Sequence, residues 1–186
     1  SPLKLYDCCP FSDGASSVVL CSEKFAKAHG GDYVEVIGSG RGGSPAALQG
    51  REHMTTIPST KIAAKAAYDM AGITAKDVDF AEVHDCFTIA EVVDTEDLGF
   101  FGKGQGIQAI REDRTKLNSD ISINPSGGLK SKGHPIGATG VGQVVEVYDQ
   151  LTGNAGARTV KDAKIGLTHN FGATGASCAV HVFQSV

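Results

Sequence analysis

The sequence lacks the features that would place it in a membrane, outside the cell or on nucleic acid. Among its 186 residues no apolar stretch reaches transmembrane length, and no signal-peptide pattern opens the chain. The net charge of −4 comes from mixed signs without a long basic run, so general binding to nucleic acid or to a membrane surface is not expected. These absences predict a cytoplasmic protein.

The sequence also lacks a disulfide framework and the signatures of two enzyme classes. An odd number of cysteines without a secretory signal indicates reduced thiols. Neither CxxC nor HExxH occurs, so no metal is expected, and a serine hydrolase would need a GxSxG elbow that is missing. The five cysteines are Cys8, Cys9, Cys21, Cys86 and Cys178.

The pattern of elements predicts an α/β domain with a mixed sheet and helices on both faces. Alternating or apolar runs predict strands at 15–22, 33–37, 78–84, 121–124, 165–168 and 178–183. Caps and helical periodicity predict helices at 22–29, 59–71, 87–98 and 141–151. In the second helix, the predicted buried face consists of Ile62, Ala63, Ala66, Ala67 and Met70. In the last, the predicted apolar stripe includes Val141, Val144 and Val145.

The glycine-rich run GSGRGG at 38–43 fits the spacing of a dinucleotide phosphate loop after a strand. The context is poor, because Pro45 stands where the helix should begin. No acidic residue follows about 20 positions later to bind a ribose. A flexible surface loop is therefore favoured.

One loop with side chains suited to catalysis is His84-Asp85-Cys86-Phe87, at a predicted strand-to-helix junction. Open α/β sheets bind their ligands at such junctions. Cys86 is expected in the first turn of the helix, where the macrodipole favours a thiolate, although a small buried apolar residue is the alternative. Asp85 is favoured as a helix cap over a catalytic group.

Two further loops carry polar groups at similar positions. His134, held between Gly133 and Pro135 just before the last helix, is well placed to act as a base or hydrogen-bond donor. Asn170, at the end of a predicted strand, would either donate to an oxyanion or bond to turn backbone. On chemistry alone, Cys86 and His134 could also form a nucleophile pair.

The motifs HDCF, NPSGGLKSKGHPIGATG and HNFGATGA, in this order and spacing, resemble the carboxy-terminal half of a thiolase. They look like the sterol-carrier-protein type and the related archaeal and bacterial acetyl-CoA C-acetyltransferases. The stretch DCCPFSDGASSVVLCSEKFA resembles the last strand and helix of that family's amino-terminal domain. The resemblance covers essentially the whole chain. It implies a tail segment at 1–32 and a thiolase carboxy-terminal domain at 33–186.

The resemblance implies acyl transfer, by Claisen condensation or thiolysis of short acyl-CoA thioesters, with coenzyme A as a substrate and no other cofactor. His134 matches the group that activates the nucleophilic cysteine. Cys86 matches the acid/base that moves the α-proton, and His84 matches a residue of an oxyanion hole. The residues implied to line the site are Asn170, Gly172, His169 and Phe87.

The sequence departs from the family in one respect. It lacks the loop with the nucleophilic cysteine, which in the family belongs to the amino-terminal half. The chain is therefore expected to be a fragment of a longer enzyme or one subunit of a split enzyme, inactive alone. The family further implies a homo-oligomer and a small zinc-ribbon/OB-fold partner. One alternative is a non-catalytic scaffold or lipid-carrier partner domain, although retention of all three chemical groups argues against it. The other, a carbon–carbon lyase on a thiolase-like fold, is disfavoured by HDCF.

Overall fold

The computed structural model describes residues 2–186, in which five strands form one mixed sheet. The strands are β1 (Val34–Gly43), β2 (Phe80–Glu82), β3 (Ser122–Ile123), β4 (Ile165–Gly172) and β5 (Ser177–Ser185). They lie in the order β1-β5-β4-β2-β3. Strand β2 pairs in parallel with β3 and β4, whereas β5 runs antiparallel to β1 and β4. The predicted mixed sheet and its closing hairpin are confirmed.

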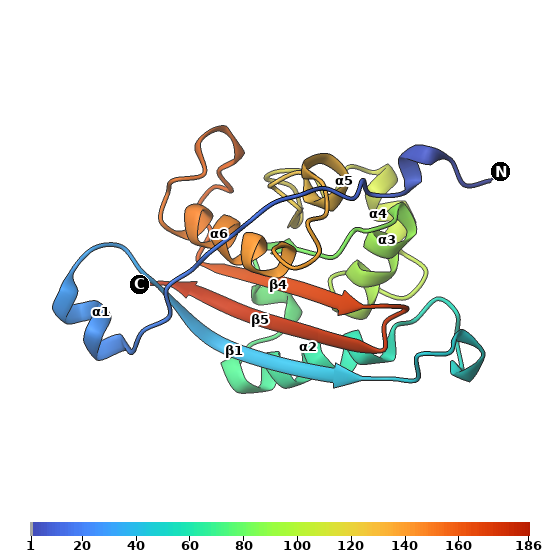
Figure 1. The fold of residues 1–186 in the computed structure, drawn as a ribbon, viewed down its shortest axis with the longest axis horizontal. Coiled ribbons are helices and arrows are strands. Elements are labelled where there is room, and N and C mark those ends of the chain that lie inside the picture. The colour runs from blue at the N-terminus through green and yellow to red at the C-terminus, as the bar shows by residue number, and fades with distance from the viewer. Residues whose placement is uncertain (1) are drawn as a thin grey trace.

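Helices cover both faces of this sheet, as predicted (Figure 1). Within residues 2–186 they are α1 (Glu23–His29), α2 (Pro58–Ala71), α3 (Thr88–Asp97), α4 (Gly106–Arg111), α5 (Gly128–Lys132) and α6 (Thr139–Leu151). Short 3₁₀ turns occupy Leu5–Asp7, Leu48–Gly50, Ala75–Asp77 and Gly156–Arg158. Helix α2 packs against β1 and β5, and α6 packs against β4. None of these helices is long and apolar enough to cross a membrane.

Two apolar clusters fix the helix layers on the sheet. On the α2 side, Ala67 packs with Leu167 and Val180, which are completely buried. On the α6 side, Val147 packs with Phe80 from β2, and both are also completely buried. Burying each large apolar side chain contributes about 1.5–3 kcal/mol, so the sheet is held from both faces.

Glycines in β1 bring α2 unusually close to the sheet. Every second residue, Gly38, Gly40 and Gly42, is buried against the helix. A Cβ atom on Gly40 would lie 2.0 Å from the carbonyl oxygen of Ala63, and one on Gly42 would lie 2.0 Å from that of Ser59. The prediction of a surface loop at 38–43 is therefore wrong. These glycines belong to a strand whose backbone meets a helix backbone.

The close contact with β1 also decides which face of α2 is buried. The small residues Ala63 and Ala67 face the sheet and are completely buried. The predicted inward residues Ile62 and Met70 are instead 51% and 64% exposed. The predicted buried face is thus confirmed at Ala63 and Ala67 and wrong at the large residues, because the gap beside the glycines admits only small side chains. The predicted end of the helix at Gly72 is confirmed by its left-handed backbone.

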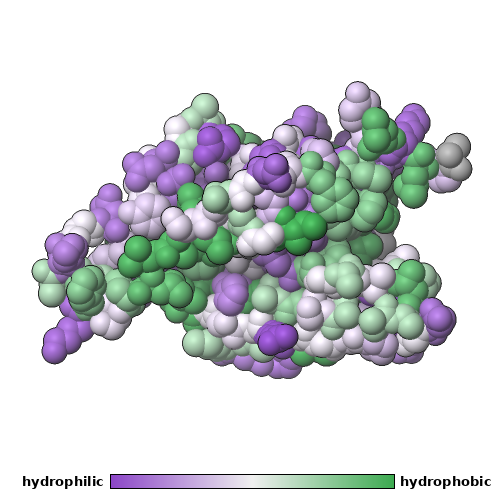
Figure 2. All heavy atoms as spheres, viewed as in Figure 1, coloured by the Kyte–Doolittle hydropathy of each residue, from purple (hydrophilic) through white to green (hydrophobic). Residues whose placement is uncertain are grey.

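The segment before β1 lies outside the sheet, crossing in front of α6 (Figure 1). The buried strand predicted at 15–22 is wrong, since Val19 is 90% and Leu20 is 81% exposed. Apolar side chains gather along this segment in Figure 2. The helix predicted at 22–29 is confirmed as α1, and Ser22 caps it by accepting the backbone N–H of Phe25 at 3.2 Å. A domain boundary at 32/33 stays a prediction.

Candidate active site

The structure brings one side chain from each predicted loop to the same end of the sheet. His84 follows β2 by two residues, Phe171 lies in the last part of β4, and His134 lies between α5 and α6. The ring centroids of His84 and His134 are 4.9 Å apart, and the rings are nearly perpendicular. Phe171 lies 4.8 Å from His84 on the same measure. Parallel strand ends thus join groups that are far apart in sequence.

His84 is held by a chain of amides. Its Nδ1 lies 3.1 Å from Oδ1 of Asn170. Nδ2 of Asn170 donates to Oε1 of Gln143 at 2.5 Å, and Nε2 of Gln143 donates to the backbone oxygen of His169 at 3.3 Å. Burial lowers the pKa of His84 to about 4, with His134 adding to the shift and the Asn170 bond opposing it. His84 is therefore neutral near pH 7.

Gln143 is a site residue that sequence reasoning missed. It is completely buried on α6, on a face that also buries Thr139, Glu146, Val147 and Gln150. The predicted apolar stripe of Val141, Val144 and Val145 is only partly buried. A glutamine four residues after Thr139, on the same helical face, was the available signal. It was overlooked because polar residues on an amphipathic helix are expected to face water.

His134 is fixed by contacts from both sides of its loop. Its backbone N–H donates to the oxygen of Pro10 at 3.0 Å, and its Nδ1 lies 2.7 Å from Oγ1 of Thr139. The Thr139 hydroxyl in turn donates to the oxygen of Pro135 at 3.2 Å. Burial lowers the pKa of His134, while Asp85 opposes the shift. The ring is thus oriented and tends towards its neutral form.

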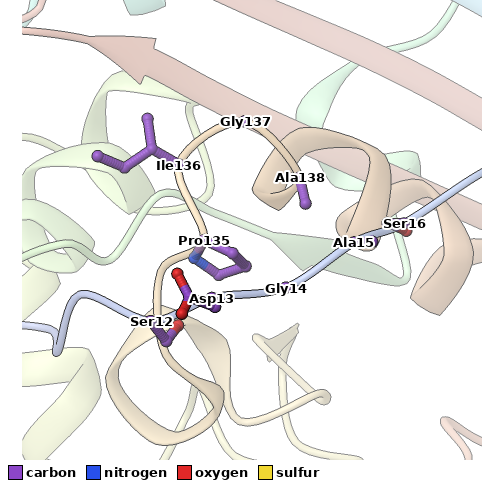
Figure 3. Close-up of a pocket in the computed structure, with 9 residues that line it drawn as sticks. All are labelled: Ser12, Asp13, Gly14, Ala15, Ser16, Pro135, Ile136, Gly137 and Ala138. Atoms are coloured by element: carbon purple, nitrogen blue, oxygen red, sulfur yellow. The ribbon is translucent and has the colours of Figure 1, made fainter.

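An open groove leads to His134. A hollow of about 350 Å³ is lined by Phe11, Ser12, Asp13, His134 and Ile136. A neighbouring hollow of about 400 Å³ continues between residues 12–16 and 135–138, which run side by side in Figure 3. Both hollows therefore depend on the amino-terminal segment, which supplies one of their walls.

Asp85 caps a helix, although not the one that follows it in sequence. Its carboxylate accepts the backbone N–H groups of Leu129 at 2.7 Å and Lys130 at 3.2 Å, in the first turn of α5. A Cβ atom on Gly128 would lie 2.4 Å from this carboxylate, so only glycine allows the approach. Asp85 therefore is a helix cap, as predicted, although of a different helix, and its bonds join the HDCF loop to the start of α5.

Cys86 stands just outside α3, because Phe87 is the N-cap residue. Burial, with lesser contributions from Asp94, Cys9 and Asp85, raises the pKa of Cys86 to about 12. The prediction of a dipole-stabilised thiolate is wrong for this chain. The thiol is protonated at neutral pH because burial disfavours its charged form more than the helix terminus favours it.

The remaining predicted residues occupy different places. His169 is completely buried beneath the site, with Nε2 2.9 Å from Oγ1 of Thr60. Its ring therefore supports the site from below instead of lining its surface. Phe87 is 46% exposed, and Gly172 is exposed at the end of β4. Within residues 2–186 no three metal-ligating side chains converge.

Beneath the site, Asp94 is completely buried, and neither carboxylate oxygen has a hydrogen-bond partner. Its Oδ2 lies 3.6 Å from Nδ1 of His169, too far for a good hydrogen bond. Burial raises the pKa of Asp94 well above its usual range, and Asp97, Glu91 and Asp85 add to this. Burial also lowers the pKa of His169 to about 3, so burial favours the neutral form of both groups.

We expect Asp94→Asn to stabilise the chain at pH 7 by about 1–3 kcal/mol, because asparagine needs no proton to be neutral, whereas a carboxyl group that is ionised in the unfolded chain must take one up on folding. A raised folded-state pKa means that the folded state holds a proton that the unfolded state has lost. The stability from Asp94 is thus fully present below its ordinary pKa and falls as pH rises towards the folded pKa. Urea unfolding at pH 4 and pH 7 measures this. The exposed control Asp69→Asn should change stability by less than about 0.5 kcal/mol. A less stable Asp94→Asn variant at both pH values would show that Asp94 is ionised and paired.

A mixed sheet between helices, with two histidines and a cysteine-bearing loop at one end, defines a thiolase-like α/β domain. The chain belongs to the thiolase C-terminal domain-like family, whose model matches residues 40–185. The resemblance inferred from the three motifs is therefore confirmed.

Among its curated relatives is an acetyl-CoA acetyltransferase of Methanothermobacter thermautotrophicus, 48% identical over 98% of this chain and 48% of that protein. The acetyl-CoA acetyltransferase of Methanocaldococcus jannaschii is 39% identical, with the same coverage. Human sterol carrier protein 2 is also 39% identical, over 94% of this chain and 33% of that protein. The chain thus spans about half the length of the two archaeal relatives.

A solved structure of an Ltp2-ChsH2(DUF35) aldolase is similar, with a TM-score of 0.74 and 18% identity. The match covers 82% of this chain and 39% of that chain. At this identity the likeness shows the fold alone.

Proposed function

We propose that this chain is the carboxy-terminal half of a thiolase-type acyltransferase acting on short acyl-CoA thioesters. The observation that supports it most is the meeting of His84 and His134, 4.9 Å apart, with Cys86 two residues after His84. Acyl transfer with carbon–carbon bond cleavage needs a nucleophile, a mobile proton and donors for an oxyanion. Of these, the chain offers a mobile proton, and its histidines can donate to an oxyanion once they have taken a proton at Nε2. We assign the nucleophilic cysteine to an amino-terminal half that is not in this sequence.

The protonated state of Cys86 suits the thiolysis direction. After the nucleophile attacks the ketone, the bond between the Cα and Cβ atoms breaks and its electron pair stays on the α-carbon of acetyl-CoA. The S–H group of Cys86 protonates that carbon, and the thiolate so formed takes the proton of incoming coenzyme A. The coenzyme A thiolate then attacks the acyl-enzyme and releases the nucleophilic cysteine. With its pKa raised to about 12, the thiol begins this sequence in the acid form.

The assembly carries further proposals. A second chain portion would cover the exposed apolar side chains along residues 2–29, such as Leu5, Tyr6, Val19 and Leu20. We also propose a homo-oligomer and a small zinc-ribbon/OB-fold partner, both resting on the resemblance, and a cytoplasmic location, which rests on the odd number of cysteines. Alkylation of Cys86 near neutral pH does not distinguish an active enzyme from the non-catalytic scaffold. Because the thiol of Cys86 is protonated, it would react slowly with an alkylating reagent in an active enzyme as well.

The proposed function is tested by thiolysis of acetoacetyl-CoA with this chain alone and with its amino-terminal half supplied. We expect no turnover from the chain alone, because it lacks the acyl-carrying thiol, and turnover when both halves are present. Loss of acetoacetyl-CoA absorbance measures the rate. Robust turnover by the chain alone would refute the assignment of the nucleophilic cysteine to the amino-terminal half. A folded two-half assembly that forms no acyl-CoA product would refute acyl transfer.

A further inference from the structure

The hydrogen bonds behind His84 have a direction, which is set by a backbone carbonyl. The oxygen of His169 has no proton, so it only accepts. Gln143 must therefore turn its Nε2–H group towards that oxygen, 3.3 Å away, and its Oε1 must point the other way. The alternative amide orientation would place two acceptors against each other inside the fold. The backbone of β4 thus decides how the Gln143 side chain is oriented.

Gln143 passes this orientation on to Asn170. Because Oε1 of Gln143 accepts, Asn170 presents its Nδ2–H group there, at 2.5 Å. The other end of the amide, Oδ1, is then left facing Nδ1 of His84 at 3.1 Å. A flipped Asn170 would set its oxygen against Oε1 of a completely buried glutamine and leave both acceptors unpaired, which disfavours that orientation.

The last link fixes the proton on His84. Oδ1 of Asn170 only accepts, so Nδ1 of His84 carries the hydrogen. A neutral imidazole has a single N–H group, so Nε2 is left with a free lone pair. The same logic applies separately to His134. The Thr139 hydroxyl donates its one proton to Pro135 and therefore accepts from Nδ1 of His134, leaving that Nε2 bare as well.

We propose that Gln143 is a positioning residue that acts through Asn170 to hold His84 in its Nδ1–H tautomer, so that Nε2 of His84 meets the substrate as a hydrogen-bond and proton acceptor. This differs from the oxyanion-hole role that the resemblance implies. An oxyanion requires a donor, and His84 donates through Nε2 only after it has taken a proton there from a reacting thiol or carbon acid. The role in the reaction rests on the proposed acyl transfer, whereas the tautomer does not.

The tautomer is measured directly by ¹⁵N NMR of the protein labelled at its histidines, at pH 7. A protonated ring nitrogen and a bare one resonate in separate ranges, and their couplings to the ring protons tell Nδ1 from Nε2. We expect His84 to show a protonated Nδ1 and a bare Nε2. A His84 with a bare Nδ1 and a protonated Nε2 would overturn the proposal, whatever the protein's activity. Absent acyl transfer with the expected spectrum would refute the proposed function alone.

The variant Gln143→Met tests the relay itself, since methionine has a similar length and no amide. Freed from Gln143, Asn170 can flip, and we expect His84 to lose its single tautomer and show averaged ring nitrogens. His134 in the same spectrum should keep its Nδ1–H form, because Thr139 and not Gln143 holds it. The matched control Gln150→Met removes another buried glutamine of α6 and should leave the His84 signals unchanged. An unchanged His84 in folded Gln143→Met would show that Gln143 does not set the tautomer.

In the assembled enzyme, a positioning role predicts a fall in kcat of roughly ten- to a hundredfold for Gln143→Met, with KM nearly unchanged. A merely structural role would instead lower the amount of folded enzyme and leave kcat per active site unchanged. The wild-type tautomer remains a decisive measurement even if the variant folds poorly.

Discussion

Gly40→Ala is expected to destabilise the chain by about 3 kcal/mol or more, and to prevent folding if the starting stability is small. The added Cβ atom would lie 2.0 Å from the oxygen of Ala63 and 2.7 Å from the nitrogen of Ala67. Both atoms belong to the backbone of α2, so neither can swing away as a flexible side chain would. Relief would require moving the helix off the sheet, which would open the apolar cluster beneath it.

Gly43→Ala is the matched control, because Gly43 ends the same strand. A Cβ atom there would meet only the oxygen of Ala176, at 3.9 Å. We expect a change of less than about 1 kcal/mol, since glycine in a strand brings no packing of its own. Urea unfolding followed by circular dichroism compares the two variants. Equal losses would mean that strand propensity decides the effect at Gly40, and not the approach of α2.

The fold was predictable where local chemistry and tertiary packing agree. The cap of α1 at Ser22 and the stop of α2 at Gly72 are local, and both are where the sequence places them. The role of residues 38–43 was missed because glycine has no side chain from which the close packing of α2 could be predicted. The alternation of Gly38, Gly40 and Gly42 is the two-residue period of a strand, yet it also fits a phosphate-loop pattern. Only the position of α2 separates the two.

The candidate site was predictable through its motifs, but not through its electrostatics. His84, His134 and Asn170 are brought together because each follows or ends an element at the same end of the sheet. The shift in the pKa of Cys86 was predicted with the wrong sign, because the helix terminus next to it in sequence is a weaker influence than burial, to which two acidic side chains add. One of these, Asp94, lies eight residues further along the chain and turns towards the core. Gln143 was missed for a related reason, since sequence periodicity does not show which polar residues are buried.

The second large effect is expected from Cys86→Ala in the assembled enzyme, where kcat for thiolysis should fall roughly 10²–10⁴-fold, the usual contribution of a general acid. KM should change little, because the thiol acts on the carbon–carbon bond and not in binding. Cys86→Ser should lose a similar factor, since a hydroxyl is a much weaker acid than a thiol. The exposed Cys21 offers a control, and Cys21→Ala should leave the rate unchanged.

The direction of the reaction sharpens this test of Cys86. Thiolysis begins with the protonated thiol, so a pKa raised to about 12 predicts no loss of rate from Cys86 between pH 7 and pH 9. Condensation begins with the thiolate as base, so its rate should rise with pH across that window. Initial rates in both directions, measured with the two halves assembled, separate these trends. If both directions kept full activity in Cys86→Ala, another group would have to move the proton, and the proposed role of Cys86 would be refuted.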